Sequence, residues 1–203
     1  MSENSWTVVT DSLDLLHNAA ALINDANAGA PTPCSAWTVT QVLQHAVGDQ
    51  LAWAAAIGVG TGPAANPFAP SGHLEVSVSD FTDPALATAR TAWAGISASD
   101  DAVPTPLPQG PLPAPTAAGA CALDAAVHAW DIAVALGQPG GLSDELAVRL
   151  LPAARSIVEP LRQFGAYAAA VPGDADDDHV AELLRYLGRD PQWGSGRGSH
   201  QAG

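Results

Sequence analysis

The stretch Leu123–Gly137, LDAAVHAWDIAVALG, constrains how the rest of the chain must be arranged. It reads as a long helix in which apolar residues occupy almost every position. Three ionisable residues nevertheless lie within it: Asp124, His128 and Asp131. A helix that is apolar on all sides is expected to be buried on all sides. The stretch therefore predicts a central helix surrounded by other elements.

The ionisable residues share one side of this helix. Five residues fall within about one quarter of a helical wheel: Cys121, Asp124, His128, Asp131 and Ala135. The opposite side carries large apolar residues. A buried carboxylate costs free energy unless a cation, a hydrogen-bond donor or a metal pairs with it. Because this helix contains no arginine, the partners of Asp124 and Asp131 must come from elsewhere.

The spacing of Asp124 and His128 fits two ligands on one helix face. Residues at i and i+4 project side by side, so both side chains can contact a single ion. The same spacing fits a buried ion pair in which His128 donates to Asp124, and the residues alone leave both interpretations open. A metal needs a third ligand from another helix, for which the candidates are His17, His45, His73 and His179. Of these, His45 lies mid-helix beside an apolar arc, where it can face a neighbouring helix.

Apolar periodicity and helix-start signals predict the other elements. Residues 6–25 form an amphipathic helix, and a capping box of Thr38 and Gln41 starts a second helix that runs to about Ile57. Further starts are expected at Asp83 before Pro84, at Thr116 for the central helix and at Ser143 for a fifth helix. Gly137 ends the central helix, and a short helix near 177–187 ends at Gly188.

These elements predict an all-α fold, a four-helix bundle with long crossover loops and a short C-terminal helix. The loops 58–80 and 99–116 are rich in proline and glycine and longer than usual bundle connections. Long loops of this kind often cover a functional site. We expect one domain over residues 1–193 and a disordered polar tail, GSGRGSHQAG, over residues 194–203.

The composition excludes several classes of partner. The 203-residue chain carries a formal charge of −14, with seven arginines and no lysine. Such a surface repels phosphate backbones and anionic lipids, so we expect neither nucleic-acid nor membrane partners. No secretory signal is visible at the N-terminus, and a cytoplasmic location is expected. The two cysteines, Cys34 and Cys121, are too few for a disulfide framework and are expected to be buried thiols.

Two separate motifs resemble a known family. The segment TPCSAWTVTQVLQHAVG, residues 32–48, resembles the TPC-x-x-W…H-x-x-G segment of the DinB-like superfamily. More narrowly, it resembles the N-terminal domain of mycothiol-dependent maleylpyruvate isomerase. The segment LDAAVHAWDIAVALGQP, residues 123–139, is similar to the second signature of that group, an acidic residue followed after three residues by H-x-W-D. The ending LLRYLGRDPQW, residues 183–193, resembles an actinobacterial subgroup.

The resemblance implies a helical bundle with a divalent metal held by His45, Asp124 and His128. The isomerase has glutamate at the position of Asp124, so a shorter carboxylate would reach the metal here. Zinc is the implied metal, with nickel, iron or manganese as alternatives. Asp131 would accept the free ring N–H of His128 and fix its tautomer. The equal alternative for Asp131 is a cap, or an ion pair with an arginine of another helix.

The implied activity is that of a metal-dependent transferase or isomerase that uses a low-molecular-weight thiol, mycothiol in actinobacteria. The metal would activate the thiol as a thiolate, which would add to a small electrophilic substrate. Two alternatives stay open: a non-catalytic bundle protein that binds a metal or a small ligand, and an enzyme on the same scaffold that acts on a pathway-specific intermediate without a thiol. On resemblance alone, a homodimer formed through bundle faces is expected.

Overall fold

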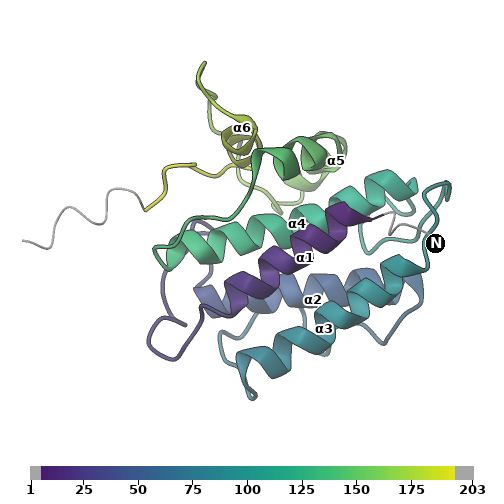
Figure 1. The fold of residues 1–203 in the computed structure, drawn as a ribbon, viewed down its shortest axis with the longest axis horizontal. Coiled ribbons are helices and arrows are strands. Elements are labelled where there is room, and N and C mark those ends of the chain that lie inside the picture. Colours follow the sequence, from purple (N-terminus) through teal and green to yellow (C-terminus); the bar gives the residue numbers. More distant parts are fainter. Residues whose placement is uncertain (1–5, 195–203) are drawn as a thin grey trace, which may run out of the picture.

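A computed structural model of the protein describes residues 6–194, and over that range its regular secondary structure is helical, apart from two isolated bridges. The six helices are α1 (Thr7–Ala20), α2 (Val39–Ile57), α3 (Val78–Ala94), α4 (Ala114–Ala135), α5 (Asp144–Arg162) and α6 (His179–Tyr186). Helices α1 to α4 form the bundle, with α1 packed on α4 and α3, and α2 packed on α3 and α4 (Figure 1). The predicted all-α bundle is thereby confirmed. Of the predicted tail, residues 195–203 lie outside the described residues.

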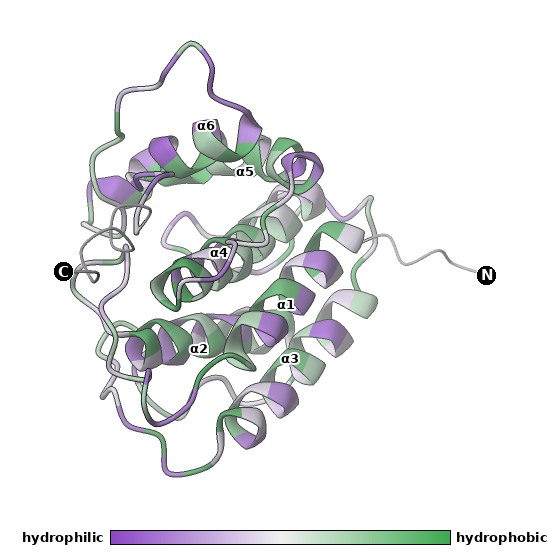
Figure 2. Cartoon of the chain, turned by 60° about the vertical axis from the view of Figure 1, so that its left-hand side comes forward, coloured by the Kyte–Doolittle hydropathy of each residue, from purple (hydrophilic) through white to green (hydrophobic). Residues whose placement is uncertain are grey.

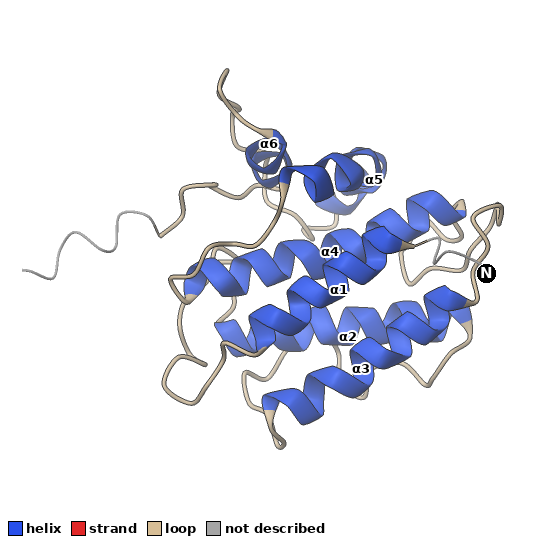
Figure 3. Cartoon of the chain, in the orientation of Figure 1, coloured by secondary structure: helices blue, strands red, loops and turns tan. Residues whose placement is uncertain are grey.

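Helix α4 is the centre of the molecule. It lies between α1 and α2 on one side and α5 on the other, and α6 packs in turn on α5 (Figures 2 and 3). Most of its residues are buried, as its composition predicts. It is also the one described helix that is long and apolar enough to span a membrane, but 89% of that apolar window is packed inside the bundle. Burial by other helices therefore accounts for its apolar composition.

A glycine sets how closely α4 and α5 approach. A Cβ atom on Gly119 would lie 2.6 Å from the Cβ of Ala153, which is closer than two carbon atoms can pack. The pairing of glycine with alanine lets the two helices touch almost backbone to backbone. Because α5 carries α6 and the segment after it, this contact also fixes where the C-terminal part of the chain lies on α4.

The start of α2 confirms the predicted capping box. The Thr38 hydroxyl accepts from the Gln41 backbone N–H, and the Gln41 side chain accepts from the Thr38 backbone N–H at 3.0 Å. Gly58 then ends the helix in the left-handed conformation, with φ of 98°. The box fixes the first turn of α2 and therefore the rotation of the face that carries His45.

Three predicted helix boundaries were wrong. Helix α1 ends at Ala20, because asparagine side chains at Asn24 and Asn27 bond to backbone N–H groups and form turns instead. Helix α3 begins at Val78 instead of Pro84, because the Ser77 hydroxyl caps it. Helix α4 begins at Ala114 and does not use Thr116 as a cap, since prolines are tolerated in a first turn whose N–H groups need no helical partner.

Candidate metal site

Three side chains from two helices meet inside the bundle. His45 comes from α2, and Asp124 and His128 come from successive turns of α4. The Nε2 atoms of the histidines lie 3.4 Å and 3.5 Å from the same oxygen, Asp124 Oδ1. One ligating atom from each residue lies within 4.8 Å of the others, and in residues 6–194 no other group of three such residues does so. The geometry brings together the residues that the resemblance named.

The outer nitrogen of each imidazole is already engaged. His45 Nδ1–H donates to the Pro67 carbonyl at 3.0 Å. His128 Nδ1–H donates to Asp131 Oδ2, also at 3.0 Å. Because the carbonyl and the carboxylate can only accept, each Nδ1 must carry the proton. In the neutral rings, both Nε2 lone pairs therefore point toward Asp124, as in histidines that bind a metal.

The carboxylate of Asp124 has fewer hydrogen-bond donors around it than its two oxygens can accept. Its Oδ2 atom is buried and has no hydrogen-bond partner, and its Oδ1 faces two histidine nitrogens. Burial acts to raise the pKa of this carboxyl, but the positive charge that His128 and His45 can carry lowers the pKa below its usual value. An ionised carboxylate with one orphaned oxygen, facing two imidazole lone pairs, is a donor set that suits a divalent cation. The residues present therefore fit the implied metal.

In the metal-free site, His45 gains a proton easily. Burial alone acts to lower its pKa, but the hydrogen bond and negative charge of Asp124 outweigh burial, and the pKa rises to about 9. The charge of Asp49, one turn further along α2, contributes in the same direction. Without a metal, a proton on His45 can neutralise Asp124. Proton and metal therefore compete for this nitrogen.

Asp131 has two partners at once. Arg189 holds it through two bonds, Nη2 to Oδ2 at 2.8 Å and Nε to Oδ1 at 3.3 Å. Oδ2 also accepts from His128, so the two roles that the sequence left as alternatives occur together. Burial acts to raise the pKa of Asp131, but the charges and hydrogen bonds of Arg189 and His128 bring it below the usual value. The pair is buried, and Asp131 has no exposed surface.

Sequence reasoning missed Arg189. It lies just after α6, and Gly188 positions it with φ of 82° in a place where a Cβ would come within 2.8 Å of the Cβ of Ala168. The one available signal was the unpaired Asp131 in a helix without arginine. Because the chain has seven arginines, this signal limited the partner of Asp131 to those seven residues but could not identify Arg189 among them.

Other titratable side chains surround the three residues. Burial, followed by the charge of Asp124, raises the pKa of Asp49 to about 8. The same two causes raise the pKa of Tyr167 above its usual value. Burial and the charge of Asp131 raise the pKa of Cys34 to about 11, and this thiol is only partly buried. Asp49 is therefore the one of these three whose proton equilibrium lies near neutral pH.

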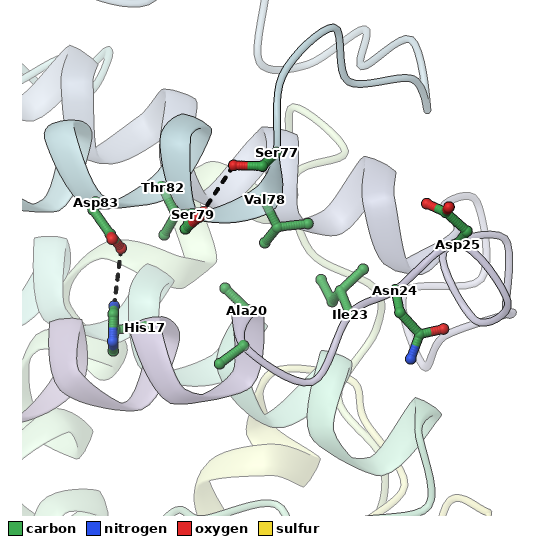
Figure 4. Close-up of a pocket in the computed structure, with 11 residues that line it drawn as sticks. His17, Ala20, Ile23, Asn24, Asp25, Ser77, Val78, Ser79, Thr82 and Asp83 are labelled. Atoms are coloured by element: carbon green, nitrogen blue, oxygen red, sulfur yellow. Dashed lines mark hydrogen bonds and ion pairs between the residues drawn. The ribbon is translucent and has the colours of Figure 1, made fainter.

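The other candidate histidines lie elsewhere. His17 is half exposed, bonds to Asp83 at 3.1 Å and lines a cleft of about 440 Å³ between α1 and α3 (Figure 4). His73 pairs with Glu75 in an exposed loop, and His179 pairs with Asp144 at the start of α6. Among the four candidates, His45 alone joins Asp124 and His128.

Comparison with known proteins assigns the family. Residues 9–133 match the family model described as the mycothiol maleylpyruvate isomerase N-terminal domain. The chain belongs to this family. The match includes the first signature segment, residues 123–133 of the second and all three residues of the candidate metal site, whereas Arg189 lies beyond it. The mycothiol maleylpyruvate isomerase N-terminal domain of this chain thus supplies α1, α2, α3 and most of α4.

Two similar proteins come from Mycobacterium tuberculosis, one from strain CDC 1551 / Oshkosh and one from strain ATCC 25618 / H37Rv. Each is 34% identical to this member of the family over 183 residues, which cover 84% of this chain and 91% of the relative. Both are described as uncharacterized proteins. No solved structure matches the chain.

Proposed function

We propose that the protein is a divalent-metal-dependent enzyme that activates a low-molecular-weight thiol of the mycothiol type. The thiol would be transferred to a small electrophilic molecule or would serve in its isomerisation. The observation that carries this proposal is the convergence of two Nε2 atoms on one oxygen of Asp124, whose other oxygen is buried without a partner. Membership of the mycothiol maleylpyruvate isomerase N-terminal domain family supports the choice of thiol.

His45, Asp124 and His128 would hold the ion. When bound, a zinc-like ion lowers the pKa of a thiol and so provides a nucleophile at neutral pH. The chain's own residues prepare the site. Pro67 and Asp131 fix the two imidazole tautomers, and the partners of each imidazole hold its ring in place. In a transfer by substitution, the thiol would lose its proton, its sulfur would form a bond to carbon, and the leaving group would depart from that carbon with the electron pair of its bond. Burial and the charge of Asp124 raise the pKa of Asp49 to about 8, so its carboxylate would be able to accept that proton.

Elemental analysis of the purified protein tests the metal part of the proposal. Protein purified without added metal should carry close to one equivalent of a divalent ion, and His45→Ala should lose it. The substitution removes one of three ligands, and two ligands hold a metal poorly. A wild-type protein that is free of metal and keeps its full stability in chelator contradicts the proposal.

A second measurement separates the enzyme from a non-catalytic binding protein. Zinc-loaded protein is mixed with mycothiol and 1-chloro-2,4-dinitrobenzene, and release of chloride with formation of the thioether is followed by absorbance. Turnover that His128→Ala abolishes supports the enzyme. Saturable quenching of tryptophan fluorescence by these compounds without turnover favours a protein that only binds them. Turnover that is unchanged when mycothiol is omitted favours an enzyme that works without a thiol.

A further inference from the structure

Aromatic rings flank His45 on its outer side. The Trp37 ring lies 4.7 Å from the imidazole, centroid to centroid, and the Phe68 ring lies 5.3 Å from it in an edge-on arrangement. These separations are those of rings in contact. A phenyl ring that touches the imidazole is close enough to contact a molecule that binds at the Nε2 atom of that imidazole and carries a bulky group.

Phe68 is held in this position by its own loop. The Asn66 side chain accepts from the Phe68 backbone N–H at 2.9 Å, and the Pro67 carbonyl accepts from His45 Nδ1–H. Pro67 also rests on α2 at Gly48, where a Cβ would lie 2.8 Å from the Pro67 Cβ. The loop and the imidazole are therefore tied together, and the position of the phenyl ring follows that of His45.

The phenyl ring is nevertheless open to solvent, with 66% of Phe68 exposed. A single exposed apolar residue is common on protein surfaces and means little by itself. Here the exposed ring is fixed against a residue of the candidate metal site. Ligand sites are typically apolar walls around a few polar groups. The arrangement of Trp37 and Phe68 around His45 has this form.

The charges around the site do not suit an anionic substrate. The guanidinium of Arg189, which lies beside the site, is taken up by Asp131 and by the Leu187 carbonyl. Each arginine in residues 6–194 forms an ion pair with a carboxylate of the chain. Within the described part of the chain, no arginine is thus left to pair with a substrate carboxylate, and the chain contains no lysine.

We propose that Phe68, together with Trp37, is the specificity-determining wall of the site, and that the substrate is an uncharged electrophile carrying an apolar group, aromatic for preference. This inference rests on the proposed function and adds the class of substrate. The exposed face of Phe68 is covered when the apolar group binds, and burial of that surface supplies the affinity. A carboxylate on that apolar group would lose its hydration against the two rings and would find no free cation of the chain to pair with.

Hydroxamic acids, which chelate zinc, provide a test with simple probes. Zinc-loaded protein is titrated with acetohydroxamate, benzohydroxamate and 4-carboxybenzohydroxamate, and binding is followed by quenching of tryptophan fluorescence, to which Trp37 contributes. We expect benzohydroxamate to bind about tenfold more tightly than acetohydroxamate, and the carboxylated probe to bind more weakly than benzohydroxamate. In Phe68→Ala the advantage of benzohydroxamate should fall to about twofold while acetohydroxamate keeps its affinity. Phe68→Leu should restore part of the advantage.

The control is Phe164→Ala, which removes another exposed phenylalanine, located after α5. It should leave all three affinities unchanged, and zinc content is measured for every variant. If both Phe68→Ala and Phe68→Leu keep the wild-type preference for benzohydroxamate, Phe68 does not determine specificity and the inference is wrong. If 4-carboxybenzohydroxamate binds more tightly than benzohydroxamate, the inference that the substrate is uncharged is wrong. A wild-type protein that takes up no zinc and binds no hydroxamate overturns the proposed function itself, and the inference falls with it.

Discussion

Helix α4 carries two buried polar clusters within two turns, and they differ in one respect. At Cys121 every polar atom has a partner: the thiol donates to Gln50 at 3.1 Å, Trp93 Nε1–H donates to the sulfur, and Gln50 donates to the Cys121 carbonyl. One turn later, Asp124 has an oxygen with no partner. The first cluster is complete with neutral groups, whereas the second is complete only with a cation. Buried polar groups that make all their hydrogen bonds are typical of a structural role. A buried charged atom without a partner indicates that a ligand binds there.

The pKa shifts support this distinction. Burial, the largest cause, raises the pKa of the Cys121 thiol well above its usual value, so the sulfur stays protonated and inert. The carboxyl of Asp124 has a lowered pKa although it is buried, because the histidines stabilise its charge. The fully buried thiol is therefore a structural group, and the carboxylate one turn away is the group prepared for chemistry.

Asp124→Asn should have the largest effect. It keeps the shape of the side chain but removes the charge that binds the ion, so zinc affinity should fall more than about a hundredfold, beyond the range for residues that only orient a ligand. Competition with a fluorescent zinc indicator measures the change. Asp124→Glu, which places the longer carboxylate at this position, should keep most of the affinity. Equal zinc affinity in wild type and Asp124→Asn contradicts the assignment of this residue.

Arg189→Met should have the next largest effect. It leaves the buried Asp131 carboxylate without its cation and with His128 as its remaining partner, which costs about 3 kcal/mol in the free energy of unfolding. Zinc affinity should fall about tenfold, because Asp131 no longer has a fixed position from which to orient His128. Urea denaturation and the zinc competition give the two values. The double variant Asp131→Asn/Arg189→Met, which removes both charges, should recover part of the stability but not the zinc affinity.

The pH should change zinc affinity by about tenfold per unit below the pKa of His45. Metal-free His45 has a pKa of about 9, and a metal must displace its proton, so affinity should rise with pH up to about 9. The stability of the metal-free protein should change in the opposite direction and fall as the pH rises. The raised pKa contributes stability below the usual histidine pKa, and this contribution is lost as pH rises through about 9. Calorimetric titrations with zinc, in buffers of different ionisation enthalpy, should show that protons are released on binding. A zinc affinity that does not change with pH contradicts the competition between proton and metal.

Cys121→Ala should have the smallest effect on the site. Loss of the sulfur leaves the Oε1 atom of Gln50 and the Nε1–H group of Trp93 without the sulfur as a partner, so the free energy of unfolding should fall by about 2 kcal/mol. Zinc content and zinc affinity should stay at the wild-type level, since the thiol takes no part in the site. Loss of zinc in this variant, at a temperature where it is folded, would remove the distinction between the two clusters.

The sequence predicted the burial of α4 and the capping box of α2 because both depend on local patterns. It also predicted three residues of the site, though two by spacing and the third, His45, decisively only by family resemblance. The helix start at Ser77 was missed because Pro84, read as a start, lies inside α3. The start at Ala114 was missed because Thr116, read as a cap, lies in the first turn of α4. Arg189 could not be found from spacing, since its distance from Asp131 along the chain is 58 residues. Contacts of that kind depend on how α5 and α6 pack.

The close approach at Gly48 has a consequence for the evolution of the site. The absence of a side chain at Gly48 lets the loop of Pro67 pack on α2, and that loop both orients the imidazole of His45 and displays Phe68. Further along, Gln41 of α2 donates to the Pro70 carbonyl, and Gln44 donates to the His73 carbonyl and accepts from the Gly72 N–H. Because these attachments use the backbone of the loop, the exposed side chain of Phe68 can change without disturbing the helix. Substitutions among residues 58–77 can thus alter the surface beside the candidate site while His45, Asp124 and His128 keep their positions in α2 and α4.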